Sequence, residues 1–137
     1  MVHDNIITSY NVDFESEILT IKTQYYSAHE RTDVIFEGYL THIFHGVMSN
    51  SMLFGIEEYP LDIFLRDEQQ ILSELKNCSW PITYKNEKEL INYLQNNNYK
   101  TFSITATLGL YGWVLAKQMD FVVVSPSSET QSSSKNE

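Results

Sequence analysis

The chain has 137 residues, 42% of them hydrophobic and 13% aromatic, which is enough apolar material for one folded domain without a disulfide or a structural metal. Eighteen acidic and nine basic side chains give a net charge of −9. This charge argues against a nucleic-acid-binding protein, which needs a basic surface to replace counterions around phosphates, and the single cysteine, Cys78, excludes an internal disulfide and a cysteine-rich zinc site.

The first part of the sequence predicts three antiparallel strands. Apolar and polar residues alternate over Ile6–Phe14, Ile18–Tyr26 and Arg31–Gly38, and short polar breaks separate these segments. Period-two alternation with β-branched and aromatic residues is typical of a meander with one solvated face.

The middle of the chain predicts two helices and a strand. Over Leu40–Val47 the apolar residues are spaced by three and four, as on one face of a helix of about two turns. Met52–Ile56 is a short apolar strand. After Pro60, an apolar stripe over Leu61–Leu75 predicts a single helix of roughly four turns.

The remaining segments predict a third helix and further strands. Asn86 and Glu89 have the spacing of a capping box, and the asparagines at 96–98 suit the end of that helix. Tyr99–Leu108 alternates again, and a hairpin-like connection over 109–112 leads to strands at Trp113–Ala116 and Phe121–Val124.

These elements predict an α+β fold. The sheet is mainly antiparallel, with about five to six strands, and two to three helices pack on one of its faces. The sequence predicts a single domain over residues 1–124 and a disordered, serine-rich tail over 125–137. No basic segment followed by an apolar run opens the sequence, and no apolar stretch approaches the ~20 residues that span a bilayer. We therefore expect a soluble, cytoplasmic protein.

The acidic side chains are unevenly distributed. Residues 1–74 hold thirteen acids and three bases, a net charge of −10, whereas residues 75–137 have a net charge of +1. Five acids fall within twelve residues: Glu57, Glu58, Asp62, Asp67 and Glu68. They either form a solvated face or capture a basic partner, whose association they would accelerate.

Several residues are candidates for catalytic or metal-binding groups. His42 and His45 share a face of the predicted helix, so they could supply half of a metal site, completed by His29 or Glu57. Glu57 and Glu58 could form a general acid–base pair, although neighbouring residues at a strand end point in different directions. A solvated role is the simpler interpretation in each case, so we expect no metal, no cofactor and no catalytic residue.

Aromatic residues suggest a recognition surface. Tyr111 lies between two glycines, where a core role is less favoured, and tyrosine and tryptophan are enriched at interface hot spots. Trp80 and Trp113 are equally compatible with an ordinary core. We therefore add Tyr111 to the acidic residues as an expected aromatic anchor.

Several short segments together resemble a known group of proteins. They are His3–Phe14, Thr32–Gly38, Ile56–Tyr59, Ser79–Pro81 and Gly109–Lys117. The chain resembles, over residues 3–124, small cytoplasmic immunity proteins of polymorphic, contact-dependent toxin systems in Bacillus-type bacteria. The resemblance implies a non-enzymatic protein that binds one cognate toxin domain, often a basic nuclease, and it carries no defined binding residues.

The sequence thus favours an acidic immunity protein that binds and blocks one basic toxin domain of the nuclease class, without contacting nucleic acid or membrane. The expected partner-binding residues are Glu57, Glu58, Asp62, Asp67, Glu68 and Tyr111. Two alternatives stay open. One is a small enzyme whose cleft uses His42, His45, Glu57 and Glu58, and the other is a domain that self-associates through a sheet edge.

Overall fold

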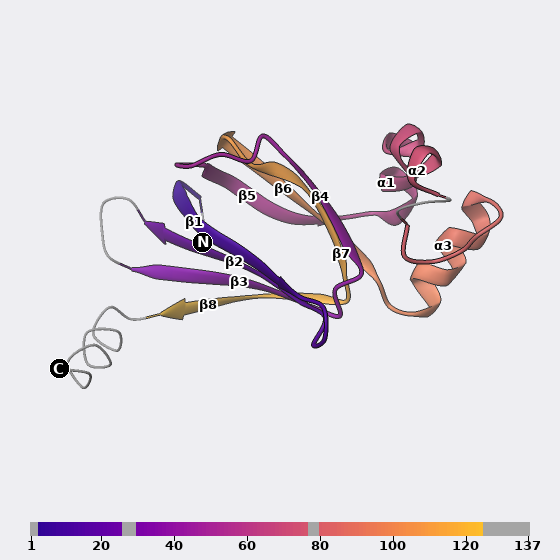
Figure 1. The fold of residues 1–137 in the computed structure, drawn as a ribbon, viewed down its shortest axis with the longest axis horizontal. Coiled ribbons are helices and arrows are strands. Elements are labelled where there is room, and N and C mark those ends of the chain that lie inside the picture. Colours follow the sequence, from indigo (N-terminus) through magenta and orange to yellow (C-terminus); the bar gives the residue numbers. More distant parts are fainter. Residues whose placement is uncertain (1–2, 26–29, 77–79, 125–137) are drawn as a thin grey trace.

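The computed structural model describes residues 3–25, 30–76 and 80–124, which form eight strands and three helices (Figure 1). The strands are β1 (Asn5–Asp13), β2 (Ile18–Tyr25), β3 (Arg31–Glu37), β4 (Thr41–His45), β5 (Met52–Tyr59), β6 (Lys100–Leu108), β7 (Tyr111–Ala116) and β8 (Gln118–Val124). The helices are α1 (Leu61–Asp67), α2 (Gln69–Leu75) and α3 (Glu87–Asn96). All strand pairs are antiparallel, in the order β4-β7-β6-β5-β1-β2-β3-β8.

The sheet is divided into two halves that face each other. One half is β4-β7-β6-β5 and the other is β1-β2-β3-β8. Among the described residues, a single strand pair connects them: Ile6 of β1 with Met52 of β5. The chain also passes between the halves at Lys117, which links β7 to β8, and over 38–40, which link β3 to β4. The Lys117 N–H donates to the Glu37 carbonyl at 2.9 Å, so these two crossings lie side by side.

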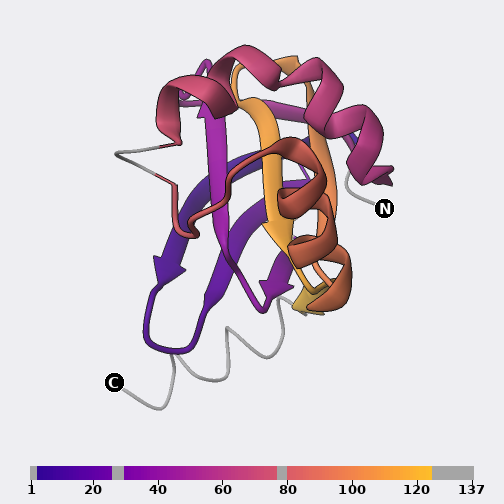
Figure 2. The ribbon, with the colours of Figure 1, turned by 90° about the vertical axis from the view of Figure 1, so that its right-hand side faces the viewer.

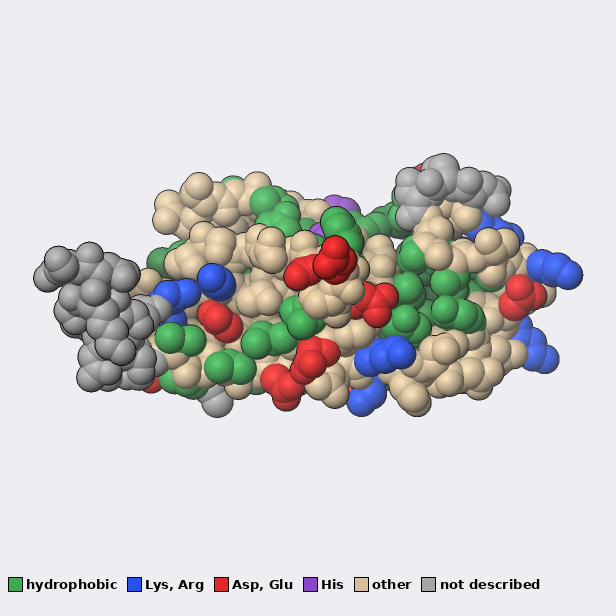
Figure 3. All heavy atoms as spheres, turned by 60° about the horizontal axis from the view of Figure 1, so that its bottom comes forward, with side chains coloured by type: hydrophobic (Ala, Val, Ile, Leu, Met, Phe, Trp, Pro, Cys, Tyr) green, Lys and Arg blue, Asp and Glu red, His purple; other side chains and the backbone are tan. Residues whose placement is uncertain are grey.

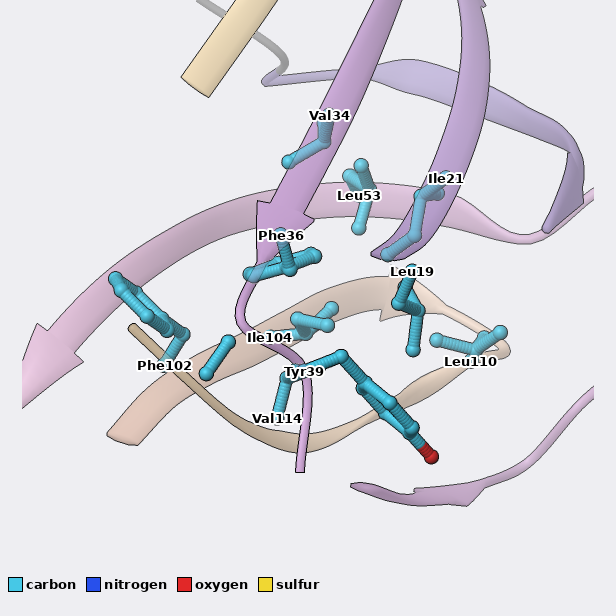
Figure 4. Close-up of a cluster of buried hydrophobic side chains, with 11 residues drawn as sticks. Leu19, Ile21, Val34, Phe36, Tyr39, Leu53, Phe102, Ile104, Leu110 and Val114 are labelled. Atoms are coloured by element: carbon cyan, nitrogen blue, oxygen red, sulfur yellow. The ribbon is translucent and has the colours of Figure 1, made fainter. Parts of the chain in front are cut away.

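The main hydrophobic core lies between the two halves. Strands β2 and β3 contribute Leu19, Ile21, Val34 and Phe36, and the other half contributes Leu53, Phe102, Ile104 and Val114; Figure 4 shows these side chains converging. All eight are buried, with Phe102 the most exposed at 4%. The alternation predicted for residues 18–26, 31–38 and 99–108 is therefore the signature of strands with one face on this core.

A second core lies between the helices and the outer face of the half β4-β7-β6-β5. Phe64, Leu65, Leu72, Leu90 and Leu94 of the helices pack with Trp113 and Leu115 of β7. Figures 1 and 2 show that the helices gather at one end of the molecule and lie across the strands there. The rest of that outer sheet face stays free of helices, and this uncovered part carries the candidate site.

The ends of α3 confirm the predicted capping residues. The Glu89 N–H donates to the Asn86 side-chain oxygen at 2.9 Å, as expected of an N-cap. At the other end, Asn98 has a φ of 62°, the left-handed conformation that asparagine tolerates better than most residues. The helix therefore begins and ends where the sequence predicted.

The predicted helix over Leu40–Val47 is wrong, because this segment forms strand β4. All five residues of β4 pair with β7, from Thr41 with Leu115 to His45 with Tyr111. The strand lies between the two cores, so Ile43 packs on the helix side and Phe44 on the opposite side. Apolar residues on both faces remove the polar alternation that would have indicated a strand.

The predicted single helix over Leu61–Leu75 is interrupted at Glu68. This residue has φ −104° and ψ 18°, outside regular helical values, and separates α1 from α2. Hydrogen bonds continue across the interruption, since the Glu68 N–H donates to the Phe64 carbonyl and the Leu72 N–H to the Glu68 carbonyl. The apolar stripe is preserved, and a kink turns Glu68 toward the sheet.

The α+β class and the antiparallel sheet are confirmed, whereas the predicted number of strands is too small. One of the additional strands is β4, for which the sequence predicted a helix, whereas the strands predicted at Trp113–Ala116 and Phe121–Val124 correspond to β7 and β8. The predicted tail at 125–137, His29 and Cys78 lie outside the described residues. Within the residues that are described, no helix is both long and apolar enough to cross a membrane.

Candidate functional site

Cross-strand pairing brings a row of side chains onto the uncovered part of the outer sheet face. Glu57 of β5 pairs with Ser103 of β6, and Ser103 pairs with Trp113 of β7. Directly opposed residues project from the same face of a sheet, with Cβ atoms about 5 Å apart. Because Trp113 belongs to the helix-side core, this row lies on the face that the helices partly cover.

An open groove of about 400 Å³ lies on this face. Its lining residues come from β4, β6, β7 and the α1–α2 junction: His45, Glu68, Ser103, Ile104, Thr105, Ala106, Tyr111, Gly112 and Trp113. The volume falls within the range of small-ligand sites, at roughly 300–1,000 Å³. The groove combines one carboxylate, two hydroxyl groups and an exposed aromatic ring, so it is equipped to bind a polar or cationic group.

Glu68 is the charged group of the groove, and its orientation is fixed. Its Oε1 accepts a hydrogen bond from the Trp113 Nε1–H at 2.9 Å. Trp113 is itself held by the ring of Phe64, whose centroid lies 4.8 Å away in an edge-to-face arrangement. The kink that ends α1 therefore positions a half-buried carboxylate on the sheet.

Glu68 has no ion-pair partner among the residues that the structure describes. Ion pairs elsewhere join Arg66 to Asp67 at 3.6 Å and His3 to Asp4 at 3.3 Å, and neither involves Glu68. A partly buried carboxylate without a cation is a position where an incoming positive charge gains electrostatic energy. The groove thus carries a negative charge that no cation among the described side chains compensates.

The negative charge of Glu68 affects the ionisation of Tyr59 at the end of β5. Burial, and after it the negative charges of Glu68 and Asp67, together raise the pKa of the Tyr59 phenol from 10 to about 12. Both effects disfavour the phenolate. Tyr59 therefore reports on the charge of Glu68.

Tyr59 is expected to stay protonated when exposed tyrosines ionise. An ultraviolet pH titration of the wild type minus a Tyr59→Phe variant should give a phenol pKa of about 12. The folded-state pKa is raised, so this phenol stabilises the fold below pH 10, and that contribution is lost as the pH rises from 10 to 12. Glu68→Gln should lower the pKa of Tyr59, and an unchanged value would place Glu68 away from this ring.

The predicted partner-binding residues do not all reach the groove. Glu68 and Tyr111 line it, and Tyr111 begins β7 with 51% of its surface exposed instead of lying within the turn. Glu57 lies beside it through its pairing with Ser103. Alternation along β5 directs Glu58 to the opposite face, where it pairs with Phe102.

The two predicted aspartates lie on helix α1, outside the groove. Asp62 occupies the first turn, where a carboxylate interacts favourably with the helix dipole, and Asp67 ends the helix beside Arg66. Both are exposed. The five clustered acids of the sequence are thus distributed over a groove, a helix surface and the opposite side of a strand.

The proposed pairing of His42 and His45 depended on a helix, and it is wrong. In β4 these residues project from opposite faces. The His42 Nδ1 lies 2.7 Å from the Tyr39 hydroxyl, and burial lowers the pKa of His42, whereas His45 lies 5.3 Å from the ring of Tyr111 at the groove. No cluster of three or more metal-ligating side chains occurs in the ranges that the structure describes.

Acidic side chains also gather on another part of the surface. Figure 3 shows a group of them near the middle of the face seen from below in Figure 1. Asp13 ends β1, and its pKa is lowered because its carboxylate accepts the backbone N–H of Ser16 and that of Glu15 in the turn that follows. The negative charge of the first half therefore has a source beyond the segment 57–68.

Three polar residues of the groove, Ser103, Thr105 and His45, are not among the predicted partner-binding residues. Ser103 and Thr105 were assigned to the polar face of a strand, and His45 was assigned to a helix. The available signal was the run of hydroxyl side chains at every second position from Thr101 to Thr107. It predicts a hydroxyl-lined strand face, but no pattern indicated that Glu68 would lie across from it.

Comparisons of the chain with protein-family models, with curated proteins and with solved structures found no match.

Proposed function

We propose that this protein is an inhibitor of the immunity-protein kind, which binds one basic protein, a toxin domain of the nuclease class, and blocks it. The observation that supports the proposal is the groove on the outer sheet face, which is lined by Glu68 and the exposed ring of Tyr111 and has Glu57 beside it on β5. Carboxylates around an aromatic residue are suited to a partner whose own site is built for phosphates.

Electrostatics supports a protein partner of opposite charge. The net charge of −9 attracts a basic domain over about a Debye length, and the uncompensated carboxylate of Glu68 adds a short-range contact. In this proposal Tyr111 packs against the partner as an anchor, and Glu57 lies at the rim. The inhibitor acts by occupying the partner's binding surface, without chemistry of its own.

Affinity purification from the producing cell, at low and moderate salt, tests the proposal. We expect one basic protein at equimolar amount, with recovery that falls as salt increases. A Glu57→Gln/Glu68→Gln variant should bind that protein roughly tenfold or more weakly, because hydrogen bonds to charged groups contribute about 1.5–3 kcal/mol each. Glutamine preserves the acceptor for Trp113, so the fold should be retained.

The matched control is Glu15→Gln/Glu30→Gln, which removes the same charge from two exposed positions outside the groove. This control should alter the affinity by less than about threefold, since exposed charges contribute little. Equal losses in both double variants would show that total charge, and not the groove, determines binding. Recovery of no basic protein at either salt concentration would contradict the proposed function.

A further inference from the structure

We propose that the groove binds one arginine side chain of the partner, with its guanidinium paired to Glu68 and stacked on the ring of Tyr111. This inference rests on the proposed function, since it names the group that the partner would insert. It uses three features of the groove: an oriented carboxylate, an exposed aromatic ring and hydroxyl groups on the adjacent strand.

The carboxylate of Glu68 is oriented for a bidentate contact. Its Oε1 is held by the indole of Trp113 at 2.9 Å, and the carboxylate lines the groove. A carboxylate offers about four lone-pair positions, so one hydrogen bond leaves capacity for the paired N–H groups of a guanidinium. A hydrogen-bonded, half-buried anion discriminates between cations by geometry as well as by charge.

The surroundings of Glu68 favour arginine over lysine. Tyr111 exposes 51% of its surface at the groove, and a planar guanidinium stacks on such a ring, whereas an ammonium is more strongly hydrated. Ser103 and Thr105 lie on the same strand face and supply oxygen acceptors, which match the five N–H donors of arginine. The Thr105 hydroxyl already donates to the Gly55 carbonyl at 3.2 Å, which leaves its lone pairs as acceptors.

The indole N–H of Trp113 provides a direct probe, because it is bonded to the same carboxylate. We would titrate the full-length protein with N-acetyl-arginine amide and record the two tryptophan indole resonances by ¹H–¹⁵N NMR, assigned with a Trp113→Phe variant. The Trp113 signal should move with increasing ligand, and backbone amide signals of β2, which lies in the other half of the sheet, should serve as the internal reference.

N-acetyl-lysine amide should bind at least about fivefold more weakly, and Glu68→Gln should weaken the arginine ligand roughly tenfold, since the charge is lost while the indole acceptor remains. Glu15→Gln should leave the titration unchanged. An immobile Trp113 signal, equal affinity for the two amides, or an unchanged titration in Glu68→Gln would each overturn the inference.

This experiment needs no partner, so its failure is separable from failure of the proposed function. A basic partner that binds with full affinity to Glu68→Gln would refute the arginine site and leave the inhibitor in place. Arginine binding at Trp113 without any basic partner in the purification would refute the inhibitor and retain the site.

Discussion

Replacing Phe64 with alanine is expected to lower the free energy of unfolding by about 3–5 kcal/mol. The Phe64 side chain is completely buried in the helix-side core, and its ring contacts Trp113 and, at 6.2 Å between centroids, Tyr59. Truncation removes these contacts and leaves a cavity where α1 meets the sheet. Total stabilities are commonly about 5–15 kcal/mol, so this loss would populate the unfolded state measurably.

Urea denaturation followed by tryptophan fluorescence measures this effect. Phe14→Ala is the matched control, because Phe14 is 78% exposed and the same truncation there should change stability by less than about 0.5 kcal/mol. Phe64→Ala should also loosen Glu68, since Phe64 holds the indole that orients that carboxylate. Equal stability losses in the two variants would contradict the assignment of Phe64 to the core.

Gly112→Ala is expected to cost about 2–4 kcal/mol, from left-handed strain and from a steric clash. Gly112 has a φ of 151°, and a Cβ atom there would collide with the backbone carbonyl of Ile43 on the paired strand. The neighbouring atoms belong to the backbone, so a side-chain rotation cannot relieve the contact. The pairing of β4 with β7, and with it the position of His45 at the groove, depends on this glycine.

Gly55→Ala gives the comparison within the same half of the sheet. A Cβ atom at Gly55 would meet only the Thr105 hydroxyl oxygen at 3.8 Å, an ordinary contact. We expect this substitution to be tolerated within about 0.5 kcal/mol. Hydrogen exchange should show faster opening of β4 in Gly112→Ala and not in Gly55→Ala, and unchanged protection of β4 in Gly112→Ala would exclude the clash.

Strands with one dry face could be predicted from the sequence. Leu19 and Ile21 in β2 alternate with polar residues, and Val34 and Phe36 in β3 lie two positions apart, because only one side of each strand meets the core. The capped helix α3 was equally predictable, since Asn86 satisfies a backbone donor through a purely local contact. Local contacts and the two-residue period of a strand were sufficient to predict an element when only one of its faces is buried.

Strand β4 could not be predicted in this way. Ile43 meets the helix-side core and Phe44 the core between the sheet halves, so neighbouring residues are both apolar and mimic helical spacing. The core between the sheet halves exists only after the two halves pack against each other, and this packing depends on contacts between residues that are distant in sequence. Glu68 and Trp113 are likewise distant in sequence. Their hydrogen bond spans 45 positions and builds the groove.

The acidic segment was only partly informative about the candidate site. Composition indicated a negatively charged surface but not which carboxylates share a side of it. Glu57 and Glu58 are adjacent in sequence and project from opposite faces of β5. Glu68 reaches the sheet because the helix is interrupted at that residue, and no glycine or proline in the sequence marks the interruption.

The central claim is that Glu57 and Glu68 bind a basic protein at the groove. The most direct measurement is the dissociation constant of the purified basic partner across a range of salt concentrations, for the wild type, Glu57→Gln/Glu68→Gln and Glu15→Gln/Glu30→Gln. The account predicts weaker binding and a shallower salt dependence for the groove variant alone. Identical affinities and identical salt slopes in all three proteins would contradict it.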